Sequence, residues 1–371
     1  MKFRVSKVDL FKCLSHIQGI VDKKNSLPIL SNILIEAVDN NIHFSSTDMD
    51  VSIIEKISCN IIENGSTTVN SQLFYDIIRK IPDSSDIEII SNNNKILTIR
   101  SNGSRFSLAS LPKEDFPIID TTNEGSSIKL NANVLFSLIE KTKFAISNEE
   151  TRYFLNGLYF NISNKNNGTT VTLVGTDGHR LAKFSYNINQ DFNELPGVII
   201  PKKTIFELSK LLQEIDSEIE VNVSSNKIIF YINDLIFVSK LIDGSFPDYK
   251  RVIPSDNNNV LNINRQSLLS AVDRVSTVAN EKAPVIKFKL LKDLINLNTV
   301  NSENSTATED IKSNYEGDEF EIGFNSKYVM DIINNLEDDE IQITLKDKSS
   351  PIIATEKSNP NLIYVLMPMR V

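Results

Sequence analysis

The stretch FRVSKVDLFKCLSHIQGIV (Phe3–Val21) decides the fold, because two later stretches repeat its pattern. They are IKLNANVLFSLIEKTKFAIS (Ile128–Ser147) and LNINRQSLLSAVDRVSTVAN (Leu261–Asn280). Each opens with an alternating, strand-like triplet and continues with apolar residues at the spacing of a helix that buries one face. The starts of the three stretches lie 125 and 133 residues apart, which predicts three copies of one unit.

A second set of three stretches follows the first set in the same order. They are VNSQLFYDIIRKIPDSSDIEII (Val69–Ile90), IPKKTIFELSKLLQEIDSEIEVNV (Ile200–Val223) and FNSKYVMDIINNLEDDEIQITL (Phe324–Leu345). Each predicts a short amphipathic helix, an acidic turn and an alternating strand. Every unit therefore has two similar halves, each a strand, a helix and further strands. The predicted fold class is α+β, with three repeated domains at residues 1–125, 126–254 and 255–371.

The composition agrees with a folded protein of several domains. A chain of 371 residues is longer than the chain that one hydrophobic core usually supports. Contents of 40% hydrophobic and 23% charged residues are typical of globular proteins. No apolar run reaches the length of about eighteen residues that a membrane span needs. Charged residues such as Lys2 and Arg4 interrupt the N-terminus, so no signal peptide is expected. Cys13 and Cys59 lack metal-ligand spacing, and two cysteines fit a reducing cytoplasm.

The net charge of −9 argues at first against nucleic acid, because most DNA-binding proteins are basic. Net charge does not describe how the charges are distributed, however. A protein that slides along DNA must also not bind phosphates tightly, since each neutralised phosphate adds affinity. The charge therefore does not exclude DNA. The repeat has a further consequence: sheets of neighbouring domains can pair edge to edge, and a second copy can close the array.

Eight segments carry a family likeness, in the order and at nearly the spacing that the family shows. They are LPIL (Leu27–Leu30), SRFSLASLP (Ser104–Pro112), RYFLNG (Arg152–Gly157), GTDGHRLA (Gly175–Ala182), SKLIDGSFPDY (Ser239–Tyr249), NEK (Asn280–Lys282), EIGFN (Glu321–Asn325) and YVLMPMRV (Tyr364–Val371). Through them the whole chain resembles the bacterial DNA polymerase III beta subunits, the DNA sliding clamps. The resemblance implies a head-to-tail homodimer that forms a ring, with helices lining the hole.

The resemblance also implies particular binding partners and a protein without catalytic activity. It implies a cytoplasmic processivity factor with no catalytic site, cofactor or metal, which encircles double-stranded DNA without sequence specificity. It implies that the DNA polymerase III catalytic subunit, the clamp loader, other polymerases and repair proteins bind through short linear peptides. A repeat-built scaffold that binds proteins and never encircles DNA is the alternative.

A peptide-binding groove is the main site that the resemblance implies. Its residues are expected to be Leu155, Thr176, Gly178, His179, Arg180, Leu181, Pro247, Arg251, Val252, Val365, Met367, Pro368, Met369 and Arg370. An apolar groove with methionines suits many partners, because the flexible thioether repacks around different side chains. Without the resemblance, YVLMPMRV predicts only a buried terminal strand.

The densest polar cluster, Thr176–Leu181, allows an enzymatic alternative. A hydrolase would use His179 as a general base that Asp177 orients. The chain has only three histidines, and it has neither a Gly-x-Ser-x-Gly elbow nor a Walker-type phosphate loop. The favoured interpretation is a tight turn between strands, in which Gly178 adopts an unusual backbone angle.

Basic residues on or near the helices are candidates for contact with DNA phosphates that is indifferent to sequence and sensitive to salt. Each of them taken singly is also explained as part of a solvated helix face. The principal candidates are Lys24, Arg79, Lys80, Arg152, Tyr153, Lys202 and Lys203, and the wider set adds Lys23, Lys141, Lys143 and Arg274. Two loop positions where the family often has Arg and Gln hold Lys24 and Glu149 here. Lys24 lacks the guanidinium fork, and Glu149 would repel phosphate.

The implied dimer interface places a strand with Arg105, Phe106 and Leu108 against Thr277 and Val278 of the partner subunit. Phe106 on an alternating strand is equally well explained as a core residue. Thr277 is more polar than the residue expected at this position from the family. The acidic loop near residues 303–310 also has fewer acidic residues than family members often have. A less stable dimer is therefore expected.

Overall fold

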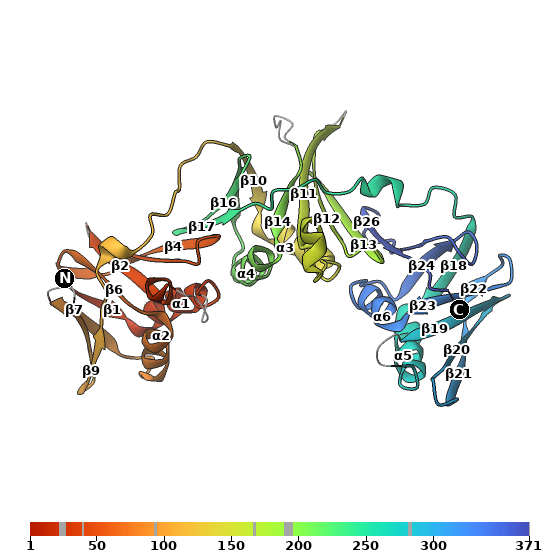
Figure 1. Cartoon of the computed structure of the whole chain (residues 1–371), viewed down its shortest axis with the longest axis horizontal. Helices are drawn as coiled ribbons and strands as arrows, with labels where there is room; N and C mark the ends of the chain where they lie inside the picture. Colours follow the sequence, from red (N-terminus) through yellow and green to blue (C-terminus); the bar gives the residue numbers. More distant parts are fainter. Residues whose placement is uncertain are drawn as a thin grey trace. The chain divides into compact units, whose positions relative to one another are not determined.

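A computed structural model of the chain describes residues 1–21, 27–38, 41–92, 95–165, 168–188, 196–280 and 284–370. The chain forms two compact units of helices and antiparallel strands, and Figure 1 labels most of their elements. One unit contains Met1–Leu135 and Phe206–Leu241, and the other contains Phe136–Ile205 and Ile242–Val371. The middle repeat contributes to both units, so the units do not coincide with the three repeats.

The helices lie where the repeated pattern predicts them. In the described part of the chain they are α1 (Lys7–Ile17), α2 (Ser71–Lys80), α3 (Ala132–Lys143), α4 (Lys202–Leu212), α5 (Arg265–Ser276) and α6 (Ser326–Asn334). Short polar side chains cap several of them: Ser6, Asn70 and Asn264 accept hydrogen bonds from backbone N–H groups in the first turns of α1, α2 and α5. The predicted apolar stripes are buried, for example Leu10, Leu14 and Ile17 of α1.

A hydrogen bond that recurs in all three repeats confirms that they share one architecture. The first N–H of α1, that of Lys7, donates to the carbonyl oxygen of Ser85 at 3.1 Å. The corresponding bonds run from Ala132 to Ser217 at 2.9 Å and from Arg265 to Asp339 at 2.8 Å. In each repeat the bond ties the first helix to the turn that follows the second helix. It satisfies one of the N–H groups that a helix start leaves unpaired.

The unit of Met1–Leu135 and Phe206–Leu241 contains two sheets. The five-stranded sheet has the order β5 (Asn60–Glu63), β1 (Lys2–Ser6), β7 (Asp86–Asn92), β8 (Ile96–Ser101) and β9 (Ser104–Ala109). The eight-stranded sheet has the order β10 (Ser126–Asn131), β15 (Glu218–Val223), β16 (Lys227–Ile232), β17 (Leu235–Lys240), β4 (Val51–Ser58), β3 (Asn41–Thr47), β2 (Asn32–Val38) and β6 (Gly65–Asn70). Two 3₁₀ turns, η1 (Pro28–Ser31) and η2 (Lys113–Asp115), complete the unit.

The other unit also contains two sheets. The nine-stranded sheet has the order β14 (Val198–Pro201), β11 (Gly157–Lys165), β12 (Gly168–Thr176), β13 (Arg180–Ile188), β26 (Leu362–Leu366), β25 (Ile352–Thr355), β24 (Glu340–Leu345), β18 (Asn259–Asn264) and β22 (Asn314–Tyr315). The four-stranded sheet has the order β21 (Thr306–Lys312), β20 (Leu294–Val300), β19 (Val285–Leu291) and β23 (Phe320–Asn325). Its 3₁₀ turns are η3 (Glu150–Leu155) and η4 (Tyr249–Arg251).

Neighbouring repeats are joined by strand pairing, as the repeat pattern predicts. In one unit β17 of the middle repeat pairs antiparallel with β4 of the first repeat, and Phe237 lies opposite Ile53. In the other unit β13 of the middle repeat pairs with β26 of the third repeat, and Ala182 lies opposite Tyr364. Each pairing satisfies strand edges that would otherwise expose unpaired backbone groups. Among the described residues, none of the helices combines the length and apolar composition that crossing a bilayer would require.

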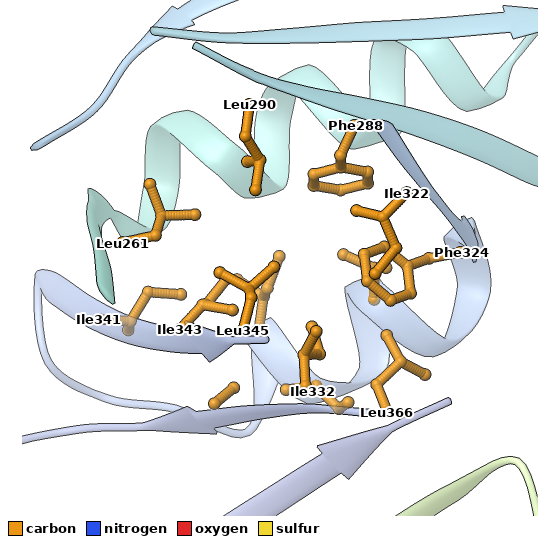
Figure 2. Close-up of a pocket in the computed structure, with 14 residues that line it drawn as sticks. Leu261, Phe288, Leu290, Ile322, Phe324, Ile332, Ile341, Ile343, Leu345 and Leu366 are labelled. Carbon is orange, nitrogen blue, oxygen red and sulfur yellow. The ribbon is translucent and has the colours of Figure 1, made fainter. Parts of the chain in front are cut away.

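The core of the third repeat contains a small apolar cavity, which Figure 2 shows among the side chains of Phe288, Phe324 and Ile332. Its volume is about 30 Å³, and aliphatic and aromatic side chains line it. This volume is close to that of one water molecule, and a cavity with an apolar lining stays dry. The cavity is therefore a packing gap and not a ligand site.

Filling this cavity is expected to stabilise the protein. Val329→Ile adds one methylene group toward the gap and should raise the free energy of unfolding by up to about 1 kcal/mol, whereas Ile332→Val should lower it by about 1 kcal/mol. The shift of the thermal unfolding midpoint measures both changes. If Val329→Ile lowers the midpoint as much as Ile332→Val does, the gap is too rigid to accept a methylene.

Candidate functional site

An apolar hollow of about 240 Å³ lies in the unit that contains the third repeat. Four segments form its walls: η3, the turn between β12 and β13, the linker after β17, and the end of β26. We call this cavity the apolar hollow. It is lined by Arg152, Phe154, Leu155, Thr176, Gly178, Arg180, Leu181, Pro247, Tyr249, Val252, Val365 and Met367. Apolar side chains dominate this surface, and a few polar groups stand at its rim. Such a lining is suited to binding the apolar side chains of a partner.

The turn Thr176–Arg180 is held by its own side chains. The hydroxyl of Thr176 donates to the carbonyl of Arg180 at 2.7 Å and accepts from the N–H of Gly178 at 3.1 Å. The carboxylate of Asp177 accepts from the N–H groups of His179 and Arg180 at 2.9 and 3.0 Å. Gly178 has a φ of +87°, and a Cβ there would lie 2.6 Å from an Nη of Arg152. The turn therefore requires glycine for its backbone angle, whereas the flexible end of the Arg152 side chain could move to make room for a Cβ.

The geometry of this turn does not support the hydrolase alternative. Asp177 directs its carboxylate to the backbone and to the guanidinium of Arg180, at 3.1 Å, and not to an imidazole that it could orient. His179 is exposed, and its ring lies beside that of Tyr328 with centroids 6.2 Å apart. In the described residues, no group of three or more His, Cys, Asp or Glu side chains is arranged to hold a metal ion.

Arg180 joins the middle repeat to the third repeat. Its guanidinium binds the carboxylates of Asp177 and Asp331 and donates to the carbonyl of Phe144 at 2.9 Å. It also lies 4.4 Å from the ring centroid of Tyr328. The Arg180 side chain is only 10% exposed, so these contacts are poorly screened by solvent. One wall of the apolar hollow is thus formed by Arg180, whose guanidinium group already has ionic and hydrogen-bonding partners.

The C-terminal segment has two parts with different roles. Tyr364 and Val365 of β26 are buried, so up to Leu366 the segment is the buried strand that its sequence alone predicts. Beyond the strand, the N–H of Met367 donates to the carbonyl of His179 at 2.9 Å, and that of Met369 donates to Gly323 at 2.8 Å. These bonds hold the Met367 side chain at the hollow.

The structure brings together nine of the fourteen predicted groove residues in one lining: Leu155, Thr176, Gly178, Arg180, Leu181, Pro247, Val252, Val365 and Met367. The lining does not include His179, Arg251, Pro368, Met369 and Arg370. The Arg251 side chain is 86% exposed and pairs with Asp248 at 2.9 Å. Three lining residues were not predicted for the groove: Arg152, which was predicted to contact DNA, Phe154 and Tyr249. The segments RYFLNG and SKLIDGSFPDY contain them, but neither shows which side chains face inward.

Burial raises the pKa of the Tyr249 phenol, in keeping with its place in this wall. Tyr249 is 7% exposed and packs in a cluster with Val174, Leu181 and Val365. The tyrosine therefore packs the linker wall of the apolar hollow against β12, β13 and β26.

The predicted DNA-contacting residues have varied surroundings. Lys24, like Lys23, lies outside the described residues. Arg79 pairs with Asp76 at 3.1 Å, and Lys80 is exposed at the end of α2. Tyr153 is 53% exposed. The N–H of Lys202 donates to the carbonyl of Asn156 at 2.9 Å, which places the start of α4, with Lys202 and Lys203, beside η3 and its residues Arg152 and Tyr153.

Glu149 forms an ion pair with Arg152, so the role of this acidic residue in the loop is to hold the Arg152 side chain. The Glu149 carboxylate accepts from Nε of Arg152 at 2.7 Å and lies 2.6 Å from Nη2. This hydrogen bond lowers the pKa of Glu149. Arg152 is thereby directed toward Gly178 and the apolar hollow, which weakens its case as a phosphate contact.

Two of the wider basic candidates have structural roles. Lys141 is buried, and its ammonium group binds Glu337 at 2.6 Å and the carbonyl of Asn335 at 2.8 Å. Arg274 binds Glu309 through two hydrogen bonds. A cation that is already paired gains less from a phosphate, so the prediction of Lys141 as part of a basic lining is corrected.

The residues predicted for a dimer interface lie on an edge strand and at the end of a helix. Within the described residues, β9 is the edge of its sheet; Arg105 on it is exposed, Phe106 is half-buried and Leu108 is 3% exposed. Phe106 is thus not a fully buried core residue. Thr277 caps the C-terminus of α5 and is exposed, and Val278 is half-buried.

The fold and the site define a class of protein: three α+β repeats joined by strand pairing, with a hollow suited to apolar side chains of a partner. Comparison with known proteins agrees. Models of the N-terminal, central and C-terminal domains of the DNA polymerase III beta subunit match residues 1–120, 129–248 and 250–370. The chain is 39% identical to the beta sliding clamp of Caulobacter vibrioides over 372 residues and 34% identical to that of Escherichia coli K12 over 373 residues, covering 100% of both chains in each case.

Solved structures show the same relationship. The sliding clamp (DNA polymerase III subunit beta) of Bartonella birtlesii bound to griselimycin has a TM-score of 0.96 and 40% identity, with 100% of both chains covered. A DNA polymerase sliding clamp of Caulobacter crescentus has a TM-score of 0.94 and 38% identity over 100% of both chains. The chain belongs to the DNA polymerase III beta subunit family, and its function is that of a DNA sliding clamp, a replication processivity factor.

Proposed function

We propose that two copies of this chain form a ring that encloses duplex DNA and tethers polymerases through the apolar hollow. The tethered partners are the polymerase III catalytic subunit, the clamp loader, and other polymerases and repair proteins, each docking a short peptide with an apolar anchor. The observation that carries this proposal is the 240 Å³ apolar hollow built around the Thr176–Arg180 turn. The protein itself catalyses no reaction and works in the cytoplasm.

The proposed groove contains the nine predicted residues that line the apolar hollow, together with Arg152, Phe154 and Tyr249. His179, Pro368, Met369, Arg370 and Arg251 are proposed to border it. The three domains are proposed to comprise residues 1–125, 126–254 and 255–371.

Ring closure is proposed to use the free edges β9 and β21. Arg105, Arg100, Glu88 and Arg4 form a cross-strand row in the five-stranded sheet, in which Glu88 separates Arg4 from Arg100. Arg105 lies opposite Arg100, so the row ends at the edge with two like charges that disfavour each other. A partner strand with a carboxylate opposite Arg105 would restore alternation, and β21 carries the exposed Asp310. Phe106 and Leu108 would then face Thr277 and Val278 of the partner subunit.

Contact with DNA is proposed for Lys24, Arg79, Lys80, Tyr153, Lys202 and Lys203, with Arg152 shared between DNA and the apolar hollow. Contacts of this kind neutralise phosphates and carry no sequence information. Since few of them are involved, binding should be weak enough for sliding and should weaken further as salt rises.

Retention on circular DNA tests the proposed function. The full-length protein, loaded by a purified clamp loader and ATP onto a nicked plasmid, is expected to co-elute with the circle in gel filtration. After the plasmid is cut once, the protein should be lost from the DNA, because a ring slides off a free end. Equal retention on circular and cut plasmid would instead favour the scaffold that binds without encircling.

A dimer-breaking variant supplies the control. Phe106→Asp places a charge at the proposed interface, and it should raise the dissociation constant of the dimer at least about tenfold. The variant should stay folded, because Phe106 is half-buried on an edge strand. A monomeric variant that is still retained on circles would contradict topological binding.

A further inference from the structure

A second hollow adjoins the apolar hollow. It has a volume of about 800 Å³, and its walls come from β11, β12 and β13, from the linker of residues 246–255 and from Asn361. We call it the polar hollow, after Asn161, Thr170, Thr172, Lys183, Ser185 and Asn187 in its lining. The two hollows share Pro247 and Tyr249 as lining residues. A peptide segment that leaves the apolar hollow over Pro247 and Tyr249 therefore enters the polar hollow.

The face of the sheet changes character along the strands. Alternate residues of a strand share one face, so Thr176, Val174, Thr172 and Thr170 of β12 lie in a row. Their partners on β13 are Leu181, Lys183, Ser185 and Asn187. Near the apolar hollow, Val174 and Leu181 belong to a buried apolar cluster with Tyr249 and Val365. Farther along the strands, hydroxyl and amide side chains replace the apolar ones.

These polar side chains retain hydrogen-bonding capacity. The hydroxyls of Thr172 and Ser185 lie 2.9 Å apart, and Thr170 donates to the amide oxygen of Asn187 at 2.8 Å. The first pair uses one of its two hydroxyl protons, and the second uses none of the amide protons of Asn187. A polar segment in this hollow would thus find both donors and acceptors.

The charges in the lining favour an acidic occupant. Lys250 is an exposed cation in the lining of the polar hollow, and among the described lining residues Asp248 is the one acidic side chain. Asp248 is already bound to Arg251 at 2.9 Å. Lys250 therefore offers an acidic occupant an ammonium partner, while the carboxylate of Asp248 is already neutralised by Arg251.

We propose that the polar hollow binds the acidic, hydrogen-bonding residues that flank the apolar anchor of a partner peptide. The proposal rests on the proposed function of the apolar hollow and adds a specificity subsite to it. Partners with the same anchor would then be ranked by their flanking residues, which is one way in which a shared site distinguishes among ligands.

Fluorescence polarisation with synthetic peptides and the full-length dimer tests the proposal. One labelled peptide carries a leucine and a phenylalanine as anchor, and others extend it at either end with two aspartates and a serine or with two lysines and a serine. For one of the two ends, the acidic extension is expected to tighten binding about fivefold to tenfold, as one or two added hydrogen bonds to charged groups would. The lysine extension should give no gain.

Matched variants locate the effect. Lys250→Glu should reverse the preference between the acidic and basic extensions, whereas Lys289→Glu on β19 should leave it unchanged. Thr172→Val should reduce the gain from the extension by about threefold. Thr169→Val, which removes a hydroxyl from the other face of β12, should not.

Each other outcome overturns the proposal in a recognisable way. If the anchor peptide binds but neither extension adds affinity, the polar hollow is not a subsite. The same holds if a gain survives both Lys250→Glu and Thr172→Val. If the anchor peptide itself does not bind, the proposed function of the apolar hollow fails, and the subsite fails with it.

Discussion

Replacing Arg180 with alanine is expected to lower the free energy of unfolding by about 3 kcal/mol and to weaken peptide binding at least about tenfold. The substitution leaves Asp177, at 14% side-chain exposure, without its cationic partner, and it removes the donor to Phe144. It also removes part of the wall of the apolar hollow. Thermal unfolding and fluorescence polarisation with an anchor peptide measure the two effects.

Arg180→Lys is the matched control for charge. Lysine keeps the positive charge, but it cannot reach Asp177, Asp331 and the Phe144 carbonyl at once with a planar fork. Its stability should therefore lie between those of the wild type and of Arg180→Ala. If Arg180→Ala unfolds at the wild-type midpoint, the contacts that join the middle and third repeats contribute nothing to stability.

Deleting Met367–Val371 is expected to abolish measurable peptide binding while leaving a folded dimer. The deletion removes the Met367 side chain from the apolar hollow and the backbone bond from Met367 to His179. The buried strand β26 ends at Leu366, so the core is retained. The measurements are fluorescence polarisation for peptide affinity and gel filtration for the dimer.

A shorter deletion separates the roles within this segment. Removing only Arg370 and Val371 leaves Met367 in place, along with the bond from Met369 to Gly323. Its effect on peptide affinity should be less than about threefold, because Arg370 is not in the lining. Unchanged affinity after the longer deletion would refute the assignment of the apolar hollow as the peptide site.

The repeat architecture was predictable because it is written in local patterns. Helix stripes such as Leu10, Leu14 and Ile17 follow from residue spacing alone, and the structure buries them. The edge-to-edge joining of repeats, seen where Phe237 faces Ile53, follows from strands that must pair their backbone groups. The resemblance to the clamp family added the expected groove, and nine of its fourteen residues line one hollow.

Side-chain partnerships were not predictable in the same way. Glu149 was expected to repel phosphate, but it binds Arg152 and directs it toward the Thr176–Arg180 turn. Lys141 was a candidate for a basic lining, but its ammonium group binds Glu337 and Asn335, which lie almost two hundred residues away in the sequence. The adjoining polar hollow was not predicted, because its lining residues come from three strands, a linker and Asn361, which lie far apart in the sequence.

The sequence by itself determined that the chain repeats an α+β unit three times, where its helices lie, and to which family it is similar. Periodicity and turn chemistry act over a few residues, so they can be recognised without coordinates. Only the tertiary structure decided which cations are already paired, which groove residues face the hollow, and that Arg180 holds two repeats together. Those outcomes depend on contacts between segments far apart in the chain, such as Arg180 with Asp331, and no local pattern specifies such contacts.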